Sequence, residues 1–399
     1  MSKLGQQMVE AVDTIKSASD QNLGSARDLS STSSNLRQDS MLLVEELSNF
    51  ELPKAQKGGE VRIGFTRHAY NIDPAYGNLR LNHELSHNYN MTLVKFGHGT
   101  RIVPGLAKDW TVSADGLIYT FRLRSDILFH NGRKVTAKDV LFSWHRALSP
   151  LLDNEGKWFL NWVEGAEEYV VGRAKNISGL KAMDDLTVEI HLKEPLAFFL
   201  NMLTAIEASV IPSEAIDEST LRMIRPIGCG PFKVLDTDRN KVTFQRFDDY
   251  FDKSIANVDR VVFDYSAKTP TDLLTALKEG SVDILPSLAK EALEELFRDD
   301  EWQSQFESAL LLSTTFFTFR CDTGPFAQKE VRQAVNYAVD KVALSAEHPA
   351  TDPKPAFGIF PPGILGFNPQ QRGYPYDPDK AKWLLTKAGH PDGFKVKIA

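Results

Sequence analysis

The 399-residue sequence predicts an α/β fold, because segments with the period of a strand alternate with segments with the period of a helix. Four stretches carry this prediction. Residues 103–148 have a strand–turn–helix pattern, residues 271–284 have a helix–strand pattern, and residues 331–342 and 378–388 have the spacing of amphipathic helices.

The first stretch contains a strand of alternating polarity. Tyr119, Phe121 and Leu123 are apolar at every second position, which is typical of a half-buried strand. A turn is predicted before this strand at Asp-Gly 115–116 and another after it at Asn-Gly 131–132, because these residues tolerate positive φ. The strand is therefore expected to lie between two tight turns.

A capped helix should follow the second turn. Thr136 precedes Asp139 by three residues, the spacing of a capping box. The apolar residues beyond it recur at helical spacing and would face a core. They are Val140, Leu141, Trp144, Ala147 and Leu148.

Apolar spacing also predicts the helices and strands that follow. Leu273, Leu274 and Leu277 predict a helix that stops at Gly280, before a short strand over residues 282–284. The helix over 331–342 would bury Val331, Ala334, Val335, Ala338, Val339 and Val342 on one face. The helix that begins near Pro378 would bury Ala381, Leu384, Leu385 and Ala388 and end at Gly389. Strand-like runs occupy residues 315–319 and 394–398.

Composition excludes several classes of function. The content of 42% hydrophobic and 25% charged residues is ordinary for a globular protein, and the net charge of -7 argues against a nucleic-acid partner. Two cysteines, Cys229 and Cys321, make no disulfide framework, although the sequence leaves their pairing open. The longest apolar run, residues 196–211, is interrupted by polar residues and predicts a buried core segment, not a membrane span.

No enzyme, metal site or cofactor is expected. The sequence has no His-Glu-x-x-His, no Cys-x-x-Cys and no Gly-x-x-x-x-Gly-Lys-Ser/Thr motif. Asp322-Thr323-Gly324 matches the tripeptide of aspartic proteases, but that chemistry needs two carboxylates that share a proton. The sequence contains no second such tripeptide, and Pro325 follows where a small hydroxyl residue is usual.

Residues 1–52 differ in composition from the remainder and predict a coiled-coil helix. Apolar and small residues recur in steps of three and four over about six heptads, which favours self-association through residues 8–50. The seam comprises Met8, Val12, Ile15, Ser19, Asn22, Ala26, Leu29, Ser33, Leu36, Ser40, Leu43, Leu47 and Phe50. This segment resembles the C-terminal tail of methyl-accepting chemoreceptors, with Asn22 where the methylation motif has Glu or Gln. Residues 53–59 form a short linker.

The stretch 103–148 also resembles the signature of the family 5 extracytoplasmic solute-binding proteins, which serve importers of oligopeptides, dipeptides and nickel. Pro226-Ile227-Gly228-Cys229-Gly230-Pro231-Phe232 is similar to the family's Gly-x-Gly-Pro-aromatic turn, with Cys229 where Thr is usual. Other matches follow in the family's order, at residues 58–63, 72–74, 246–250, 258–261, 280–284, 331–340 and 376–394.

The resemblance implies a two-lobed fold, the periplasmic-binding-protein type II fold, that closes on a solute by hinge motion. Residues 60–93 and 212–300 would form lobe I, residues 94–211 its extra subdomain, and residues 301–399 the start of an incomplete lobe II. It also implies an importer component that binds short peptides, with nickel, opines and sugars as other family solutes. Its partner would be an ABC permease in the membrane.

Two segments are candidates for the solute site. Tyr76, Gly77 and Asn78 follow the turn after the first strand, and Phe316, Thr318 and Arg320 lie on the apolar run between the lobes. The aromatic rings could pack on a solute, and the guanidinium could pair with a carboxylate. The aspartate that binds the peptide α-ammonium group in family members has no match here.

The sequence supports two hypotheses about the cellular location and the function of the protein. The resemblance implies an extracytoplasmic protein, whereas residues 1–5 lead into a polar segment without the apolar core of a signal peptide, so the chain as written is expected in the cytoplasm. The alternative function is therefore an intracellular solute sensor that signals through the N-terminal coiled coil.

Overall fold

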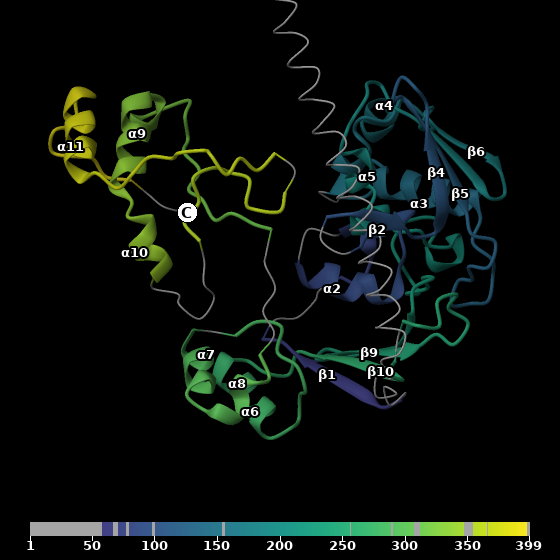
Figure 1. Ribbon diagram of the computed structural model, residues 1–399. Helices are drawn as coiled ribbons and strands as arrows, with labels where there is room; N and C mark the ends of the chain where they lie inside the picture. The colour runs from purple at the N-terminus through teal and green to yellow at the C-terminus, as the bar shows by residue number, and fades with distance from the viewer. Residues whose placement is uncertain are drawn as a thin grey trace, which may run out of the picture. The chain divides into compact units, whose positions relative to one another are not determined.

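The computed structural model divides the chain into two units, Met1–Lys57 and Gly58–Ala399 (Figure 1). It describes residues 58–66, 71–76, 80–97, 100–153, 156–255, 257–288, 290–306, 312–346, 354–364 and 366–396. The predicted coiled coil over residues 1–52, and the linker except for Gly58 and Gly59, lie outside the described residues.

One four-stranded sheet combines the beginning of the described chain with residues from its middle. Its strands are β1 (Glu60–Gly64), β10 (Arg260–Asp264), β9 (Lys241–Arg246) and β8 (Phe232–Thr237), in that order. β1 runs parallel to β10, and the other pairs are antiparallel. Phe65, Phe244 and Phe263 pack beneath this sheet with Leu85 and Tyr89 of α2 (Arg80–Tyr89).

Short helices follow β10 in the chain. Helix α6 (Pro270–Lys278) contacts β1 and buries Leu273 and Leu274, and the chain turns at Gly280 with φ of +70°, as predicted. The expected strand over 282–284 is reduced to a single parallel bridge between Ile284 and Ile63. Two more helices come next, α7 (Lys290–Phe297) and α8 (Asp300–Gln303).

A second, fully antiparallel sheet is built from residues 107–191. Its order is β4 (Ala107–Val112), β5 (Ile118–Leu123), β7 (Thr187–His191) and β6 (Leu180–Asp184). The helix α3 (Ala137–Leu148) contacts β6 and β7, and buries Trp144 against Phe159. A two-stranded ribbon of β2 (Val94–Phe96) and β3 (Ile102–Pro104) precedes the sheet.

Short helical turns complete this region. They are η2 (Gly156–Leu160), α4 (Ala166–Val170), α5 (Phe199–Met202), η3 (Ile206–Ala208) and η4 (Ser213–Ala215). The apolar run over 196–211 is core, as predicted, because Phe199, Leu203 and Val210 are buried.

The pattern over residues 103–148 predicts the structure well. Tyr119, Phe121 and Leu123 are all buried, on the face that meets α3 and its neighbours. Gly116 and Gly132 have φ of +74° and +86° at the two expected turns. The Asp139 carboxylate accepts hydrogen bonds from the backbone and hydroxyl of Thr136, both at 2.8 Å, at the helix start.

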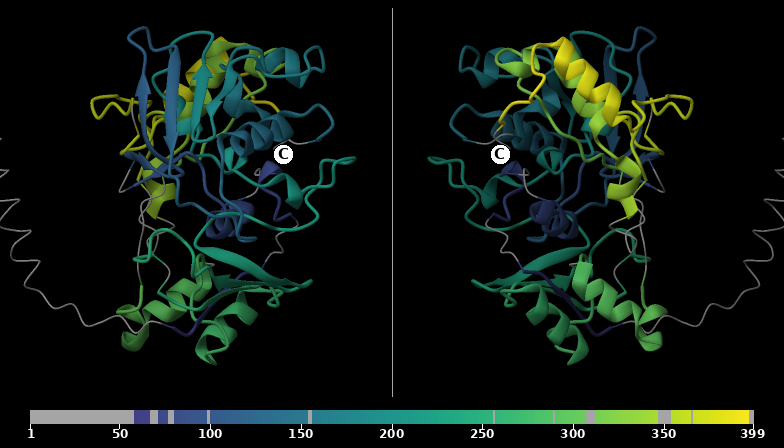
Figure 2. Two further views of the ribbon diagram at one scale, coloured as in Figure 1. Left: turned by 90° about the vertical axis from the view of Figure 1, so that its right-hand side faces the viewer. Right: turned by 90° about the vertical axis from the view of Figure 1, so that its left-hand side faces the viewer.

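The described residues beyond 312 form a helical pair and extended segments. Helices α9 (Lys329–Ala338) and α11 (Pro378–Lys387) lie side by side (Figures 1 and 2), with Ala334, Ala381 and Leu384 between them. The 3-10 helix η5 (Pro325–Ala327) precedes α9, and α10 (Lys341–Ala346) follows it.

Two expectations for this region are wrong. The helix over 331–342 is not continuous, because Asp340 accepts a hydrogen bond from the Ala343 backbone at 2.9 Å and starts a new helix, which leaves Val342 67% exposed. Neither strand-like run is a strand: residues 315–319 and the described part of the second run, 394–396, are extended without pairing to any described strand. A strand needs a neighbour for its backbone hydrogen bonds, whatever its propensity.

Candidate functional site

The first candidate segment is a short turn that ends at Tyr76. The side chain of Asn71 accepts a hydrogen bond from the Asp73 backbone at 2.9 Å, and Asp73 accepts one from the Ala75 backbone at 3.0 Å. Such local bonds are why Asn and Asp favour turns. They lead into the 3-10 helix η1 (Pro74–Tyr76). Tyr76 is half-buried against the larger core, and its carbonyl accepts from Asn82 Nδ2 at 2.9 Å.

A buried ion pair connects this turn to helix α3. The Arg146 Nη1 donates to Asp73 Oδ1 at 3.0 Å, and Nη2 donates to the other carboxylate oxygen. The two side chains are only 2% and 5% exposed. Because a bidentate guanidinium–carboxylate pair fixes direction as well as distance, it defines where the turn lies. The sequence does not predict this pair, because no local pattern links Asp73 to a residue 73 positions away.

Hydrogen bonds of His130 join the Asn-Gly turn at residues 131–132 to the turn at residues 228–230. Gly228 donates its backbone N–H to His130 Nδ1 at 3.3 Å, and Nε2 of the same ring contacts the Gly230 carbonyl at 3.1 Å. Nδ1 therefore accepts and Nε2 donates, which requires a neutral imidazole. Burial lowers the pKa of His130 to about 4, in agreement with that requirement. The turn passes so close to α2 that a Cβ at Gly228 would overlap the Tyr89 carbonyl oxygen.

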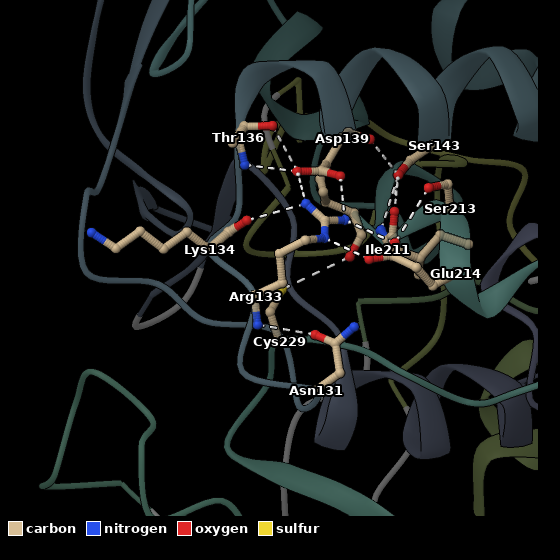
Figure 3. Close-up of polar contacts among 11 residues, drawn as sticks. Asn131, Arg133, Lys134, Thr136, Asp139, Ser143, Ile211, Ser213, Glu214 and Cys229 are labelled. Atoms are coloured by element: carbon tan, nitrogen blue, oxygen red, sulfur yellow. Dashed lines mark hydrogen bonds and ion pairs between the residues drawn. The ribbon is translucent and has the colours of Figure 1, made fainter.

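A network centred on Arg133 holds η4 against the start of α3 (Figure 3). Arg133 Nη2 donates to Asp139 at 2.7 Å, and Nε donates to Glu214 at 2.7 Å. The hydrogen bond from Arg133 lowers the pKa of Glu214, which favours the ionised form of that carboxyl beside the guanidinium. Ser143 adds a bridge, because its hydroxyl accepts from the Ile211 backbone at 2.9 Å. These contacts fix residues 211–214 to α3, the helix that also carries Arg146.

The second candidate segment is exposed. Phe316 is 59% exposed and Thr318 is exposed, in extended chain that is not a strand. Arg320 donates to Asp322 at 3.1 Å across an exposed ion pair. Among described residues, no hydrogen bond, ion pair or ring contact joins this segment to Tyr76. Gly77 and Asn78 lie outside the described residues.

The described residues lack what a metal site, a membrane-spanning helix and a disulfide bond require. That part of the chain brings together no group of three His, Cys, Asp or Glu side chains suited to a metal ion. It also contains no helix of the length and apolar character that crossing a membrane requires. Cys229 and Cys321 are both free thiols, the first buried and the second exposed, which settles their pairing.

Comparison with known proteins agrees with the fold. Residues 101–399 match the profile of the bacterial extracellular solute-binding proteins, family 5, middle region. The heme-binding protein A of Haemophilus influenzae is 32% identical over 76% of this chain and 57% of its own length. The dipeptide-binding protein of Escherichia coli is 29% identical over 77% of this chain and 58% of its own length. The chain thus spans under three-fifths of these relatives.

A solved structure extends the comparison. The murein tripeptide binding protein MppA of Escherichia coli superposes with a TM-score of 0.72 at 25% identity, over 84% of this chain and 68% of that one. The α/β periplasmic-binding-protein type II fold is thereby confirmed. The family and the fold are those of binding proteins, not of enzymes. Since the profile matches about three quarters of the sequence, this chain belongs to family 5 of the bacterial extracellular solute-binding proteins.

Proposed function

We propose that the chain is the solute-binding component of an ABC-type importer and that its solutes are short peptides. The observation that carries the proposal is the family match over residues 101–399. Relatives named for a dipeptide and for a murein tripeptide make peptides the favoured solute class. Closure of two lobes over the peptide would present the loaded protein to a membrane permease. This role requires export, so we place the working protein outside the cytoplasm.

In this proposal residues 60–93 and 212–300 form lobe I, residues 94–211 its subdomain, and residues 301–399 the start of lobe II. Tyr76, Gly77 and Asn78 contact the peptide from lobe I. The anchored turn before them favours this role, because a fixed backbone presents its polar groups without an ordering cost on binding.

Phe316, Thr318 and Arg320 contact the peptide from the other side. Arg320 can take part because its partner Asp322 is an exposed carboxylate, in an ion pair of small energetic value. A peptide carboxylate held between the lobes would be shielded from water and would bind the guanidinium more tightly.

Isothermal titration calorimetry with trialanine tests the proposal. We expect saturable binding to the unaltered chain and a loss of at least about tenfold in affinity for Arg320→Met, since a charge-assisted hydrogen bond contributes roughly 1.5–3 kcal/mol. Arg239→Met is the matched control, because Arg239 is exposed in the β8–β9 turn and outside the proposed site. Saturable binding that is equally weakened by both substitutions would contradict the site.

Heme is the second candidate solute, because the relative with 32% identity is named heme-binding protein A. Titration with hemin, followed by its Soret absorbance, distinguishes the two solutes. Binding of hemin with no response to trialanine would replace the peptide proposal while leaving the family role intact.

The sensor role stays a proposal that concerns residues 1–52. If residues 8–50 self-associate through the heptad seam, Leu29→Lys together with Leu36→Lys would convert an oligomer to a monomer in sedimentation velocity. Substituting Ser31 and Asn35, which lie outside the seam, with Lys is the matched control. Monomeric behaviour of the unaltered chain would refute the coiled-coil role.

A further inference from the structure

Three segments that are distant in the sequence meet at the Arg146 guanidinium. Its two terminal nitrogens donate to the Asp73 carboxylate, which belongs to the turn before Tyr76. Its Nε donates to the Leu221 carbonyl at 2.8 Å. Arg146 is part of α3, and the next residue of that helix, Ala147, is buried in the larger core. The planar guanidinium therefore links α3 to two other segments, the turn that contains Asp73 and the turn that contains Leu221.

The turn around Leu221 is conformationally unusual. Leu221 has φ of +56°, and among the described non-glycine residues it alone has positive φ. Residues with a branched side chain rarely adopt this conformation, so surrounding contacts must hold it in place. Asp217 supplies some of them, since its carboxylate accepts from the backbones of Ser219 at 3.0 Å and Thr220 at 2.8 Å. Leu221 itself donates its backbone N–H to the Asp217 carbonyl at 2.8 Å, and its own carbonyl accepts from Arg146.

Other contacts restrain the same turn before Tyr76 from α2. The Tyr89 hydroxyl donates to the Ile72 carbonyl, and Asn82 donates to the Tyr76 carbonyl. Tyr89 also approaches the sulfur of Met223 at 3.8 Å, beyond the strained turn. Both turns are thus fixed to α2 and α3: Arg146 bonds to Asp73 and Leu221, and the Tyr89 hydroxyl contacts Ile72 and Met223.

We propose that Arg146 is a positioning residue for solute binding. It holds residues 71–76, and through them Tyr76, in the geometry that meets the solute, and it couples this turn to residues 217–223. The proposal rests on the proposed function, in which Tyr76 contacts the solute. Because Arg146 is buried, it would act on the solute through this turn and not by direct contact.

Hydrogen–deuterium exchange of the full chain tests the positioning without any solute. Arg146→Lys keeps the charge but cannot donate to Asp73 through a fork and to Leu221 together. We expect exchange to become at least roughly tenfold faster in residues 71–76 and 217–223, with α3 and β5 unchanged, as for a local opening. Arg122→Lys is the matched control, because Arg122 pairs with Asp109 on the exposed surface. Unchanged exchange in both turns would overturn the proposal.

Titration with trialanine tests the consequence for binding. If Arg146→Lys leaves the turn in its binding geometry only about a tenth of the time, the apparent Kd rises about tenfold. The double variant Asp73→Asn with Arg146→Met removes both charges, so neither is buried alone, and its Tm should exceed that of Arg146→Met. Its affinity should stay low, because the fork is still absent. Affinity that recovers together with Tm would show a merely structural role and refute positioning.

The two proposals fail differently. If the unaltered chain binds no trialanine, the peptide function is wrong, while the exchange experiment still decides whether Arg146 positions the turn. If trialanine binds and Arg146→Lys changes neither the exchange of residues 71–76 nor the affinity, the peptide function stands and the role of Arg146 is refuted.

Discussion

Protonation of His130 should destabilise the fold in mild acid. The ring is neutral in the structure, with Nδ1 accepting from Gly228 and Nε2 donating to the Gly230 carbonyl. A proton on Nδ1 would place two donors against each other. Burial lowers the pKa of His130 to about 4 in the folded chain, from an ordinary 6.5. The unfolded chain therefore takes up the proton first, and stability is lost as the pH falls from about 6.5 towards 4.

The size of the effect follows from the two pKa values. A difference of about 2.5 between the two pKa values corresponds to at most about 3.5 kcal/mol of unfolding free energy, at about 1.4 kcal/mol per pKa unit. At pH 5 the unfolded chain is almost fully protonated at this site and the folded chain is not. The contribution of His130 should therefore fall by about 2 kcal/mol between pH 7.5 and pH 5.

Urea unfolding followed by tryptophan fluorescence measures this directly. The variant His130→Gln keeps a side-chain amide near the turn but does not titrate, so the other groups of the protein cancel in the comparison. We expect the free-energy difference between the unaltered chain and His130→Gln to shrink by about 2 kcal/mol from pH 7.5 to pH 5. A difference that changes by less than about 0.5 kcal/mol over that range would show that the folded chain does not hold His130 in its neutral form.

Three further predictions concern the core and the thiols. Trp144→Ala removes a fully buried indole and should lower the unfolding free energy by about 3–5 kcal/mol in urea titrations; a loss below about 1 kcal/mol would contradict the packing. Gly228→Ala should abolish the cooperative thermal transition, because its methyl group would overlap the Tyr89 carbonyl, and a Tm within a few degrees of the unaltered chain would contradict this close approach. Thiol titration with Ellman's reagent should detect Cys321 alone in the folded chain and both thiols after denaturation. Cys229 should not react in the folded chain because it is buried and burial raises its pKa to about 12. Rapid reaction of both thiols in the folded chain would contradict the burial of Cys229.

The elements that the sequence predicts well are those that local chemistry determines. The alternation around Phe121 indicates which face of the strand is buried, and the Thr136–Asp139 spacing before an apolar stripe marks the start of α3. Asn131-Gly132 turns the chain because a glycine there accepts φ of +86°. None of these signals depends on a distant part of the chain.

The sequence is less informative where distant residues decide the outcome. The pair of Asp73 with Arg146 has no local signature, although it fixes the turn before Tyr76. The run around Phe316 has the composition of a strand, but a strand also needs a partner, which composition does not reveal. At Asp340 an apolar stripe continues through the sequence, yet the side chain caps a second helix and redirects the stripe to solvent.

Native mass spectrometry of the freshly purified chain, followed by denaturation to release and identify bound small molecules, would determine whether this protein carries peptides. The peptide-binding account predicts a mass above that of the 44.7 kDa chain and short peptides in the released fraction. A chain that carries no solute, and that gains none when it is mixed with trialanine before the measurement, would contradict the account.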